Sequence, residues 1–291
     1  MKPQEIYEVS PTAHPEYIYT VAEIGINHNG DVEIAKKLIQ MAKIAGCDAV
    51  KLQKRDLELV YGSALLDQPR ESPWGTTQRD QKQALEFGDD EYSVLRNLCY
   101  ELEIDFSSSA WDEKSLDFLD GFDLSFQKVA SALATKLDFV ESVASRKKIT
   151  LLSLGMCTLE QADAAMEIFT KHNCPVIPLH CVSTYPTPEN NLNLIQIQML
   201  RDRYKTNVGY SGHEASVSPS VVAATLGAAV IERHITLDRS MYGSDQSASL
   251  EKEGIESLVS ILRKVPMYLG NAQKIPTKEE MQVAKKLRYW E

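Results

Sequence analysis

Short apolar runs alternate with amphipathic runs along almost the whole chain. The first apolar run covers residues 17–25 and ends at a polar turn, INHNG. The segment after it places Ile34, Leu38 and Met41 at helical spacing. Asp31 stands where a helix N-cap is expected, and Gly46 stands where the helix should stop. The pattern predicts a strand followed by a helix.

This strand-and-helix unit recurs through the sequence. Eight apolar runs can be followed, at residues 17–25, 47–53, 103–109, 124–131, 148–155, 176–183, 206–212 and 228–236. One unit of a (β/α)8 barrel takes about 31 residues of a chain of ~250, and both the count and the spacing suit that architecture. A doubly wound open sheet would show the same alternation without requiring eight repeats. We therefore predict the α/β class and a single-domain TIM barrel.

The barrel is expected to occupy residues 17–270. Residues 1–16 form an N-terminal extension predicted to cap the bottom of the barrel, and residues 271–291 form a C-terminal tail. Residues 55–87 interrupt the regular spacing and are rich in Gln, Asp, Pro and Gly. We interpret them as a long loop over the mouth of the barrel.

Composition excludes several classes of protein. Lys and Arg total 31 against 41 Asp and Glu, which gives a formal charge of −10 and argues against sequence-independent binding of nucleic acid. The apolar stretches, such as residues 220–231, are shorter than the ~20 residues that a membrane span requires. The amino terminus resembles neither a secretory signal nor a transit peptide. Five cysteines without CxxC spacing suggest reduced thiols, and we expect a cytoplasmic protein.

Polar residues collect where the predicted strands end, which is the face on which such barrels carry their chemistry. Lys51 and Lys128 lie inside apolar runs, and a buried charge is costly unless it is paired or used. A neighbouring carboxylate could satisfy either lysine for structural reasons alone. Two lysines beside several serine-bearing strand ends instead favour binding of phosphate and carboxylate groups.

Two histidines suggest a metal site. His213 and His234 end what would be the neighbouring strands seven and eight, and closure of the barrel brings Glu23 of strand one next to strand eight. A single histidine is usually structural, whereas two imidazoles with a carboxylate suit Mn, Fe, Co or Zn better than Ca. We interpret His180 and Cys181 as packing residues.

Several segments together resemble the sialic acid synthase (N-acetylneuraminate synthase) family of enzymes that condense phosphoenolpyruvate. The matching segments occur in order at residues 22–31, 45–53, 106–119, 127–131, 152–161, 179–188, 208–213 and 230–251, and include AEIGINHNGD, QKVAS and VGYSGH. The resemblance implies a transferase. It would condense phosphoenolpyruvate with an N-acetylmannosamine-like or related aldose, giving a sialic or nonulosonic type of 3-deoxy-2-ulosonic acid and phosphate.

The resemblance also implies roles for individual residues and for partners. His213 and His234 match the metal ligands, with Mn²⁺ expected and Mg²⁺ or Co²⁺ as alternatives, and Glu23 matches a catalytic carboxylate beside them. The residues that match the phosphoenolpyruvate site are Lys51, Ser109, Lys128, Ser131, Ser153, Ser183 and Ser211. The positions that match the acceptor site are Gln53, Tyr185, Asp245 and Gln246. The family further implies a homodimer that acts on small molecules.

Three departures from the family pattern concern the acceptor. Many members continue into an antifreeze-like domain of ~60 residues, large enough to fold as a unit, and this chain is expected to be a short form without it. Ala132 and Leu133 follow the QKVAS motif where Gly-Glu is usual, Gln246 replaces a common His, and Ser183 replaces an Asn found in some members. Two alternatives therefore stay open: a 3-deoxy-ulosonate-phosphate synthase that uses an aldose phosphate, and a non-catalytic sugar-binding barrel.

Overall fold

The structure, a computed structural model, describes residues 1–271 and 273–290. Eight parallel strands close into a barrel in the order β1-β10-β9-β8-β7-β6-β5-β2. Along the chain they are β1 (Tyr19–Gly25), β2 (Ala49–Lys54), β5 (Asp105–Ala110), β6 (Gln127–Val129), β7 (Thr150–Ser153), β8 (Val176–Cys181), β9 (Val208–Gly212) and β10 (Ala228–His234). Each strand coincides with one of the eight predicted runs, although β2 and β5 extend one residue beyond theirs. The closed ring confirms the (β/α)8 barrel and excludes the open doubly wound sheet.

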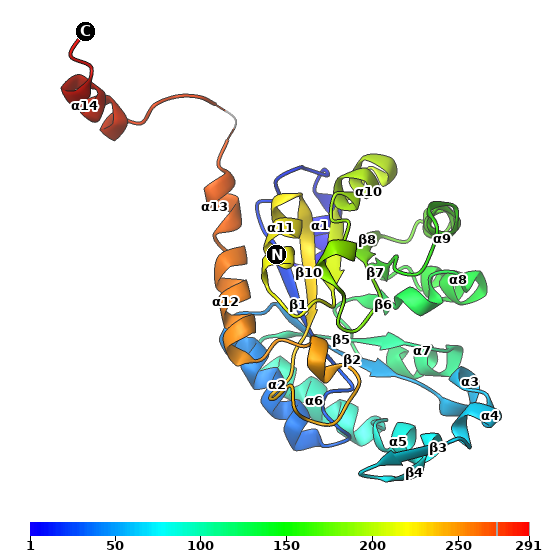
Figure 1. Cartoon of the computed structure of the whole chain (residues 1–291). Helices are drawn as coiled ribbons and strands as arrows, with labels where there is room; N and C mark the ends of the chain where they lie inside the picture. Colours follow the sequence, from blue (N-terminus) through cyan, green and yellow to red (C-terminus); the bar gives the residue numbers. More distant parts are fainter. Residues whose placement is uncertain (272, 291) are drawn as a thin grey trace.

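Helices connect successive strands and cover the outside of the ring (Figure 1). They are α2 (Val32–Ala45), α6 (Asp89–Glu101), α7 (Glu113–Asp120), α8 (Leu137–Ser145), α9 (Leu159–Lys171), α10 (Gln196–Tyr204), α11 (Ser218–Thr225) and α12 (Lys252–Leu262). Short 3₁₀ helices follow three strands: η1 (Ser131–Leu133), η2 (Glu189–Asn191) and η3 (Gln246–Ala248).

The first unit forms as its local sequence predicts. The Asp31 carboxylate accepts hydrogen bonds from the backbone N–H groups of Glu33 and Ile34, which caps α2. Gly46 ends the helix with φ of 82°, a left-handed conformation that glycine adopts without steric penalty. Leu38 is fully buried on the side of α2 that faces the barrel core.

The amino-terminal segment folds onto the end of the barrel formed by the amino ends of the strands. Helix α1 (Pro3–Glu8) places Ile6 in the same apolar cluster as Tyr19 inside the barrel. The Asn207 side-chain amide donates hydrogen bonds to the carbonyl oxygens of Ile6 and Val9, at 2.7 and 2.9 Å. These contacts attach residues 1–16 to the amino ends of the strands.

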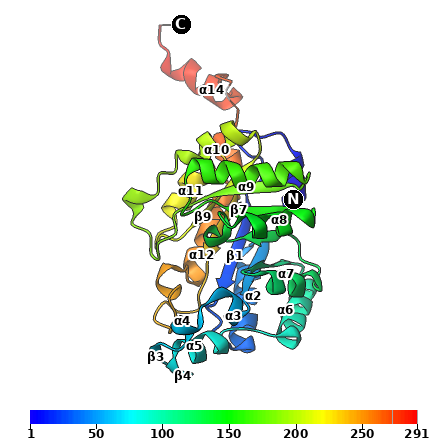
Figure 2. The ribbon, with the colours of Figure 1, turned by 90° about the vertical axis from the view of Figure 1, so that its right-hand side faces the viewer.

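Residues 55–87 contain more regular structure than the loop that the sequence predicted. They form α3 (Leu57–Val60), α4 (Ser63–Leu66), an antiparallel hairpin of β3 (Pro69–Ser72) and β4 (Gly75–Thr77), and α5 (Gln78–Ala84). Figures 1 and 2 show this insertion at the lower end of the molecule, away from α1. Capping accounts for α5, because the Thr77 hydroxyl accepts from the Asp80 N–H while the Asp80 carboxylate accepts from the Thr77 N–H.

The chain leaves the barrel after α12. Helix α13 (Val265–Leu269) follows it, and α14 (Lys278–Leu287) lies apart from the rest of the molecule, with no buried residue (Figure 1). Within residues 1–271 and 273–290, none of the helices combines the length and the apolar character needed to cross a bilayer.

Candidate active site

The strands bring functional side chains together because alternate residues of each strand point into the barrel. On β1 the inward positions run from Tyr19 through Val21 to Glu23, and on β10 they run from Val230 through Glu232 to His234. Tyr19, Val21 and Val230 belong to a buried apolar cluster inside the barrel. Inward residues are therefore apolar near the amino ends of these strands and become polar toward the carboxyl ends.

A cavity of about 190 Å³ opens at these carboxyl ends. The seven residues predicted to bind phosphoenolpyruvate all line it: Lys51, Ser109, Lys128, Ser131, Ser153, Ser183 and Ser211. The predicted catalytic and metal-binding residues Glu23, His213 and His234 line it too, as do two of the predicted acceptor residues, Gln53 and Tyr185. We call this space the inner cavity. Of the remaining predicted residues, Asp245 lines a second cavity beside it, and Gln246 lines neither.

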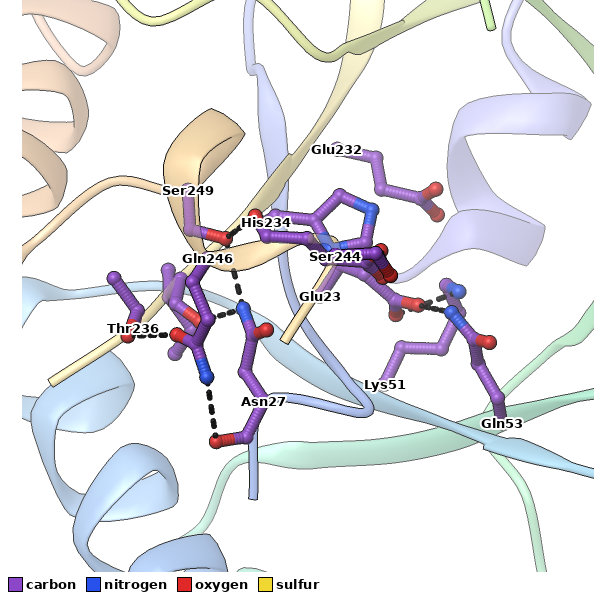
Figure 3. Close-up of polar contacts among 12 residues, drawn as sticks. Glu23, Asn27, Lys51, Gln53, Glu232, His234, Thr236, Ser244, Gln246 and Ser249 are labelled. Atoms are coloured by element: carbon purple, nitrogen blue, oxygen red, sulfur yellow. Dashed lines mark hydrogen bonds and ion pairs between the residues drawn. The ribbon is translucent and has the colours of Figure 1, made fainter. Parts of the chain in front are cut away.

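Lys51 is paired with Glu23 inside the inner cavity. The lysine Nζ lies 2.6 Å from Glu23 Oε2, and the Gln53 amide donates to Glu23 Oε1 at 2.7 Å (Figure 3). Both charged side chains are 3% exposed or less. Burial raises the pKa of Glu23, while the Lys51 ammonium opposes that shift. Glu23 is thus a buried carboxylate held by one ammonium and one amide.

Lys128 has a different set of partners. Its Nζ donates to Ser153 Oγ at 2.8 Å and to the Val129 carbonyl at 2.9 Å, and it lies 3.9 Å from Glu232 Oε1. Burial lowers the pKa of Lys128. Burial alone would raise the pKa of Glu232, but Lys128 and other nearby positive charges outweigh it and lower that pKa to about 2. Both lysines therefore have a carboxylate neighbour, as expected if their role were only structural. Both also line the inner cavity, as expected if they bind an anionic ligand.

The two histidines stand beside each other. The His213 and His234 ring centroids are 5.4 Å apart, and the Tyr185 ring lies 4.2 Å from the first and 5.9 Å from the second. His213 Nδ1 is 3.0 Å from the Val182 carbonyl. A carbonyl only accepts, so this nitrogen carries a proton, and in the neutral ring Nε2 keeps the lone pair. Burial opposes protonation of His213, but the contacts with Cys181 and the Val182 carbonyl outweigh it and raise its pKa.

The donor atoms of the pair suit a divalent cation. His234 Nδ1 is buried without a hydrogen-bond partner, and burial lowers the pKa of His234 to about 3, which keeps the ring neutral at pH 7. Neutral imidazole is the form that binds metal ions. Among the described residues, no group of three or more His, Cys, Asp or Glu side chains is arranged to hold a metal. A cation here would take two imidazoles from the protein and its other ligands from bound small molecules.

Sequence reasoning gave no role in the site to two polar residues that line the inner cavity, Cys181 and Glu232. Cys181, interpreted as packing, has its Sγ 3.8 Å from His213 Nδ1 and accepts from the Ser131 hydroxyl at 3.4 Å. Burial alone would raise the pKa of this thiol, but the contact with His213 outweighs it and lowers the pKa. Strand alternation could have found both, since Cys181 follows the inward residue Leu179 by two positions and Glu232 precedes His234 by two.

Gln246 lies behind the site rather than in it. Its side chain is 1% exposed, accepts a hydrogen bond from the Thr236 hydroxyl and approaches the carbonyl oxygens of Asn27 and Tyr242 (Figure 3). The side chain therefore lines neither cavity, which is not the position expected of an acceptor-binding residue. The physical reason is that η3 turns Gln246 into the protein, while the preceding residue, Asp245, faces the cavity, 3.9 Å from His234 Nδ1.

The second cavity, of about 400 Å³, lies between the barrel mouth and the insertion. We call it the outer cavity. It shares Gln53, Trp111 and Tyr185 with the inner cavity, so the two spaces meet at these side chains. Arg55, Arg70 and Lys82 also line it, and sequence reasoning assigned none of them. The insertion carries four basic and six acidic residues, so its composition gave no sign that Arg55, Arg70 and Lys82 would gather at one cavity.

Comparison with known proteins identifies the family. The NeuB family matches residues 38–274. The chain is 39% identical to an N-acetylneuraminate-9-phosphate synthase of Drosophila melanogaster over 259 residues, covering 86% of this chain and 70% of the relative. It is 32% identical to an N,N'-diacetyllegionaminic acid synthase of Legionella pneumophila, covering 96% and 81%.

A solved structure shows the same architecture. The N-acetylneuraminic acid (sialic acid) synthetase of Leptospira borgpetersenii, crystallised with citrate, superposes with a TM-score of 0.82 at 29% identity, covering 94% of this chain and 93% of that one. These matches confirm the resemblance drawn from the sequence motifs. The chain is an enzyme of the synthase type, and it belongs to the NeuB family.

Proposed function

We propose that this enzyme condenses phosphoenolpyruvate with a sugar aldehyde, using a divalent cation, to give a nonulosonic acid and inorganic phosphate. The relatives named above are synthases of N-acetylneuraminate 9-phosphate and of N,N'-diacetyllegionaminic acid, which supports this product class. The observation that carries the proposal is the inner cavity, which is lined by two buried lysines, Lys51 and Lys128, and by the adjacent imidazole rings of His213 and His234.

Phosphoenolpyruvate carries close to three negative charges and would bind through the lysines and serines. Lys128 already donates to Ser153 Oγ, and its carboxylate neighbour is 3.9 Å away, beyond hydrogen-bond distance. Lys51 lies 3.5 Å from Ser109 Oγ. Ser131 and Ser211 add two further hydroxyls to the same wall. Charge-assisted hydrogen bonds from these groups offset the cost of burying the ligand's charge.

The chemistry needs three events around this ligand. C3 of the enol attacks the aldehyde carbon, a water oxygen adds at C2, and the C2–O bond to phosphate breaks. We assign Glu23 to the water, because it is a buried carboxylate with a raised pKa held in position by Lys51 and Gln53. The aldehyde would lie against Tyr185, between the inner and outer cavities.

His213 and His234 would hold the cation, for which Mn²⁺ is our first choice and Mg²⁺ or Co²⁺ are alternatives. When bound, the cation supplies Lewis-acid polarisation of the aldehyde. The unpartnered His234 Nδ1 and the protonation of His213 Nδ1 support these roles. We also propose that the protein works as a homodimer in the cytoplasm. Its five cysteines are all unpaired, as is usual in a reducing compartment.

The two residues after QKVAS, where the family resemblance led us to expect Gly-Glu, offer no hydrogen-bonding side chain. Ala132 lines the inner cavity, and Leu133 is buried. Neither side chain can hydrogen-bond a sugar, so this chain would recognise its acceptor through other groups.

The test is a turnover assay with a matched pair of variants. Phosphoenolpyruvate consumption is followed at its ultraviolet absorbance, with Mn²⁺ and a panel of aldoses and aldose phosphates. His234→Gln should lose more than about 100-fold in kcat/KM, while the control His172→Gln, at the end of α9, should keep its activity. Chelation by EDTA should abolish turnover, and Mn²⁺ should restore it. Full activity of His234→Gln, or of the chelated protein, would refute the metal assignment, and no consumption with any acceptor would refute the function.

A further inference from the structure

Each of the two candidate metal ligands is next in sequence to one member of a buried ion pair. Glu214 follows His213, and Arg233 precedes His234. The Arg233 guanidinium lies 2.9 Å from the Glu214 carboxylate, and the two side chains are 1% and 0% exposed. Neither side chain lines the inner or the outer cavity, so the pair can act on a bound ligand only through its neighbours.

His213 lies just beyond the end of the strand ladder. Strand β9 pairs with β10 as far as Gly212, which stands opposite Arg233. His234 is the last residue of β10 and is still paired with β1. The barrel ladder therefore fixes the backbone of His234, whereas loop contacts must fix that of His213.

Contacts from two sides hold the backbone at His213. On the β8 side, the His213 carbonyl accepts a hydrogen bond from the Thr187 N–H at 3.0 Å. On the β10 side, the Arg233 guanidinium donates to the carbonyl oxygens of Glu214 and Ser216, the second at 3.0 Å. One arginine thus joins the residue before His234 to the chain that directly follows His213.

The Glu214 carboxylate folds back against the same backbone. Its Oε2 accepts from the Tyr210 hydroxyl at 2.7 Å, and its Oε1 accepts from the Ser220 hydroxyl at 3.3 Å. A Cβ on Gly212, the residue before His213, would lie 2.7 Å from Glu214 Oε2. The carboxylate therefore occupies the space that a side chain at residue 212 would need, which ties its position to the start of the loop.

We propose that Arg233 and Glu214 are positioning residues for the imidazole pair: their ion pair and hydrogen bonds hold His213 where it and His234 can bind one cation. This inference rests on the proposed function, which assigns the two histidines to a divalent cation. A buried ion pair adds little net stability, because desolvation offsets much of its attraction. Its fixed geometry instead orients its neighbours, and residues behind metal ligands change metal affinity by about 10- to 100-fold.

The experiment measures the affinity for Mn²⁺ alone, by electron paramagnetic resonance of the free ion. Arg233→Lys keeps the charge but lacks the planar fork of donors, and it should bind Mn²⁺ about 10- to 100-fold more weakly than the wild type. The matched control is Arg263→Lys. Arg263 likewise binds a carboxylate, that of Asp48, and the carbonyl oxygens of Ile18 and Gly46, but at the amino ends of the strands. This control should lose stability to urea and keep the wild-type affinity.

Wild-type Mn²⁺ affinity in Arg233→Lys, or an equal loss of affinity in Arg263→Lys, overturns the inference. If Arg233→Lys does not fold, Tyr210→Phe takes its place. Removal of the hydroxyl that holds Glu214 Oε2 should weaken Mn²⁺ binding by about 2- to 10-fold, and unchanged binding overturns the inference.

A second readout separates this inference from the proposed function. Failure of the wild type to bind Mn²⁺ would refute the metal assignment, and the histidine ring signals of the metal-free protein, measured by NMR, then decide the positioning role. The chain has six histidines, and His213→Gln and His234→Gln identify the two signals. Arg233→Lys should shift the His213 signal, while Arg263→Lys should leave it in place. An unshifted His213 signal in Arg233→Lys overturns the inference.

Discussion

His28 is buried in its neutral form, which makes the stability of the barrel depend on pH. The ring is 2% exposed, stacks on Phe87 at 4.0 Å and accepts a hydrogen bond at Nδ1 from the Gly30 N–H. Burial, assisted by the nearby Arg55 charge, lowers its pKa to about 3. The perturbation is acidification from pH 7.5 to pH 5, compared between the wild type and His28→Gln.

The magnitude follows from proton linkage. The pKa of an unfolded histidine is about 6.5, above the folded value of about 3. The unfolded state therefore takes up the proton first, and stability present above pH 6.5 is lost as the pH falls toward 3. At pH 5 the difference is about 2 kcal/mol relative to pH 7.5. Other buried groups, such as His234, respond in the same direction, so only the difference from the variant isolates His28.

The assay is reversible urea unfolding of both proteins at pH 8.5, 7.5 and 5. The free energy of unfolding of the wild type minus that of His28→Gln should be constant between pH 8.5 and 7.5, which serves as the control. It should then fall by about 2 kcal/mol at pH 5. The same difference at pH 5 as at pH 7.5 would show that His28 is protonated or solvated in the folded protein.

Three further predictions follow from other contacts. Lys128→Met should raise the KM for phosphoenolpyruvate by about 10- to 100-fold, with a smaller change in the KM for the acceptor; initial-rate kinetics would contradict this role if both constants rose equally. Gly30→Ala should loosen the insertion, because φ is +73° and the new Cβ would lie 2.0 Å from the Ala84 carbonyl oxygen. Limited proteolysis should cleave the variant faster than the wild type within residues 78–87, and resistance equal to that of the wild type would count against the contact. Glu214→Gln should destabilise the fold by about 3 kcal/mol, since it leaves the buried charge of Arg233, 2.9 Å away, without its partner; urea unfolding would measure this loss, and a change below about 0.5 kcal/mol would argue against the pair.

Much of the fold could be predicted from the chain alone, because barrel strands are short, apolar and regularly spaced. All eight predicted runs coincide with a strand to within one residue at the carboxyl end of β2 and β5, and Asp31 and Gly46 bound α2 as expected. The insertion was harder to predict. Its hairpin and short helices depend on turn capping and on contacts to distant loops, such as that of Arg70 with Tyr242, which local patterns do not contain.

The candidate site divides in the same way. Polar residues at strand ends could be recognised one at a time, and the parallel barrel then forces them onto one face. Which residue pairs with which could not be recognised. Lys51 is paired with Glu23, and Gln246 turns into the protein although its neighbour Asp245 faces the cavity.

The order of residues by itself determined the repeating units, the polar strand ends and the acidic balance of the chain, because these depend on local propensity and composition. Only the tertiary structure decided the pairing of the buried charges and the cationic wall of the outer cavity. Those features join residues far apart in the chain, and their electrostatics depend on burial, which closure of the barrel and docking of the insertion create.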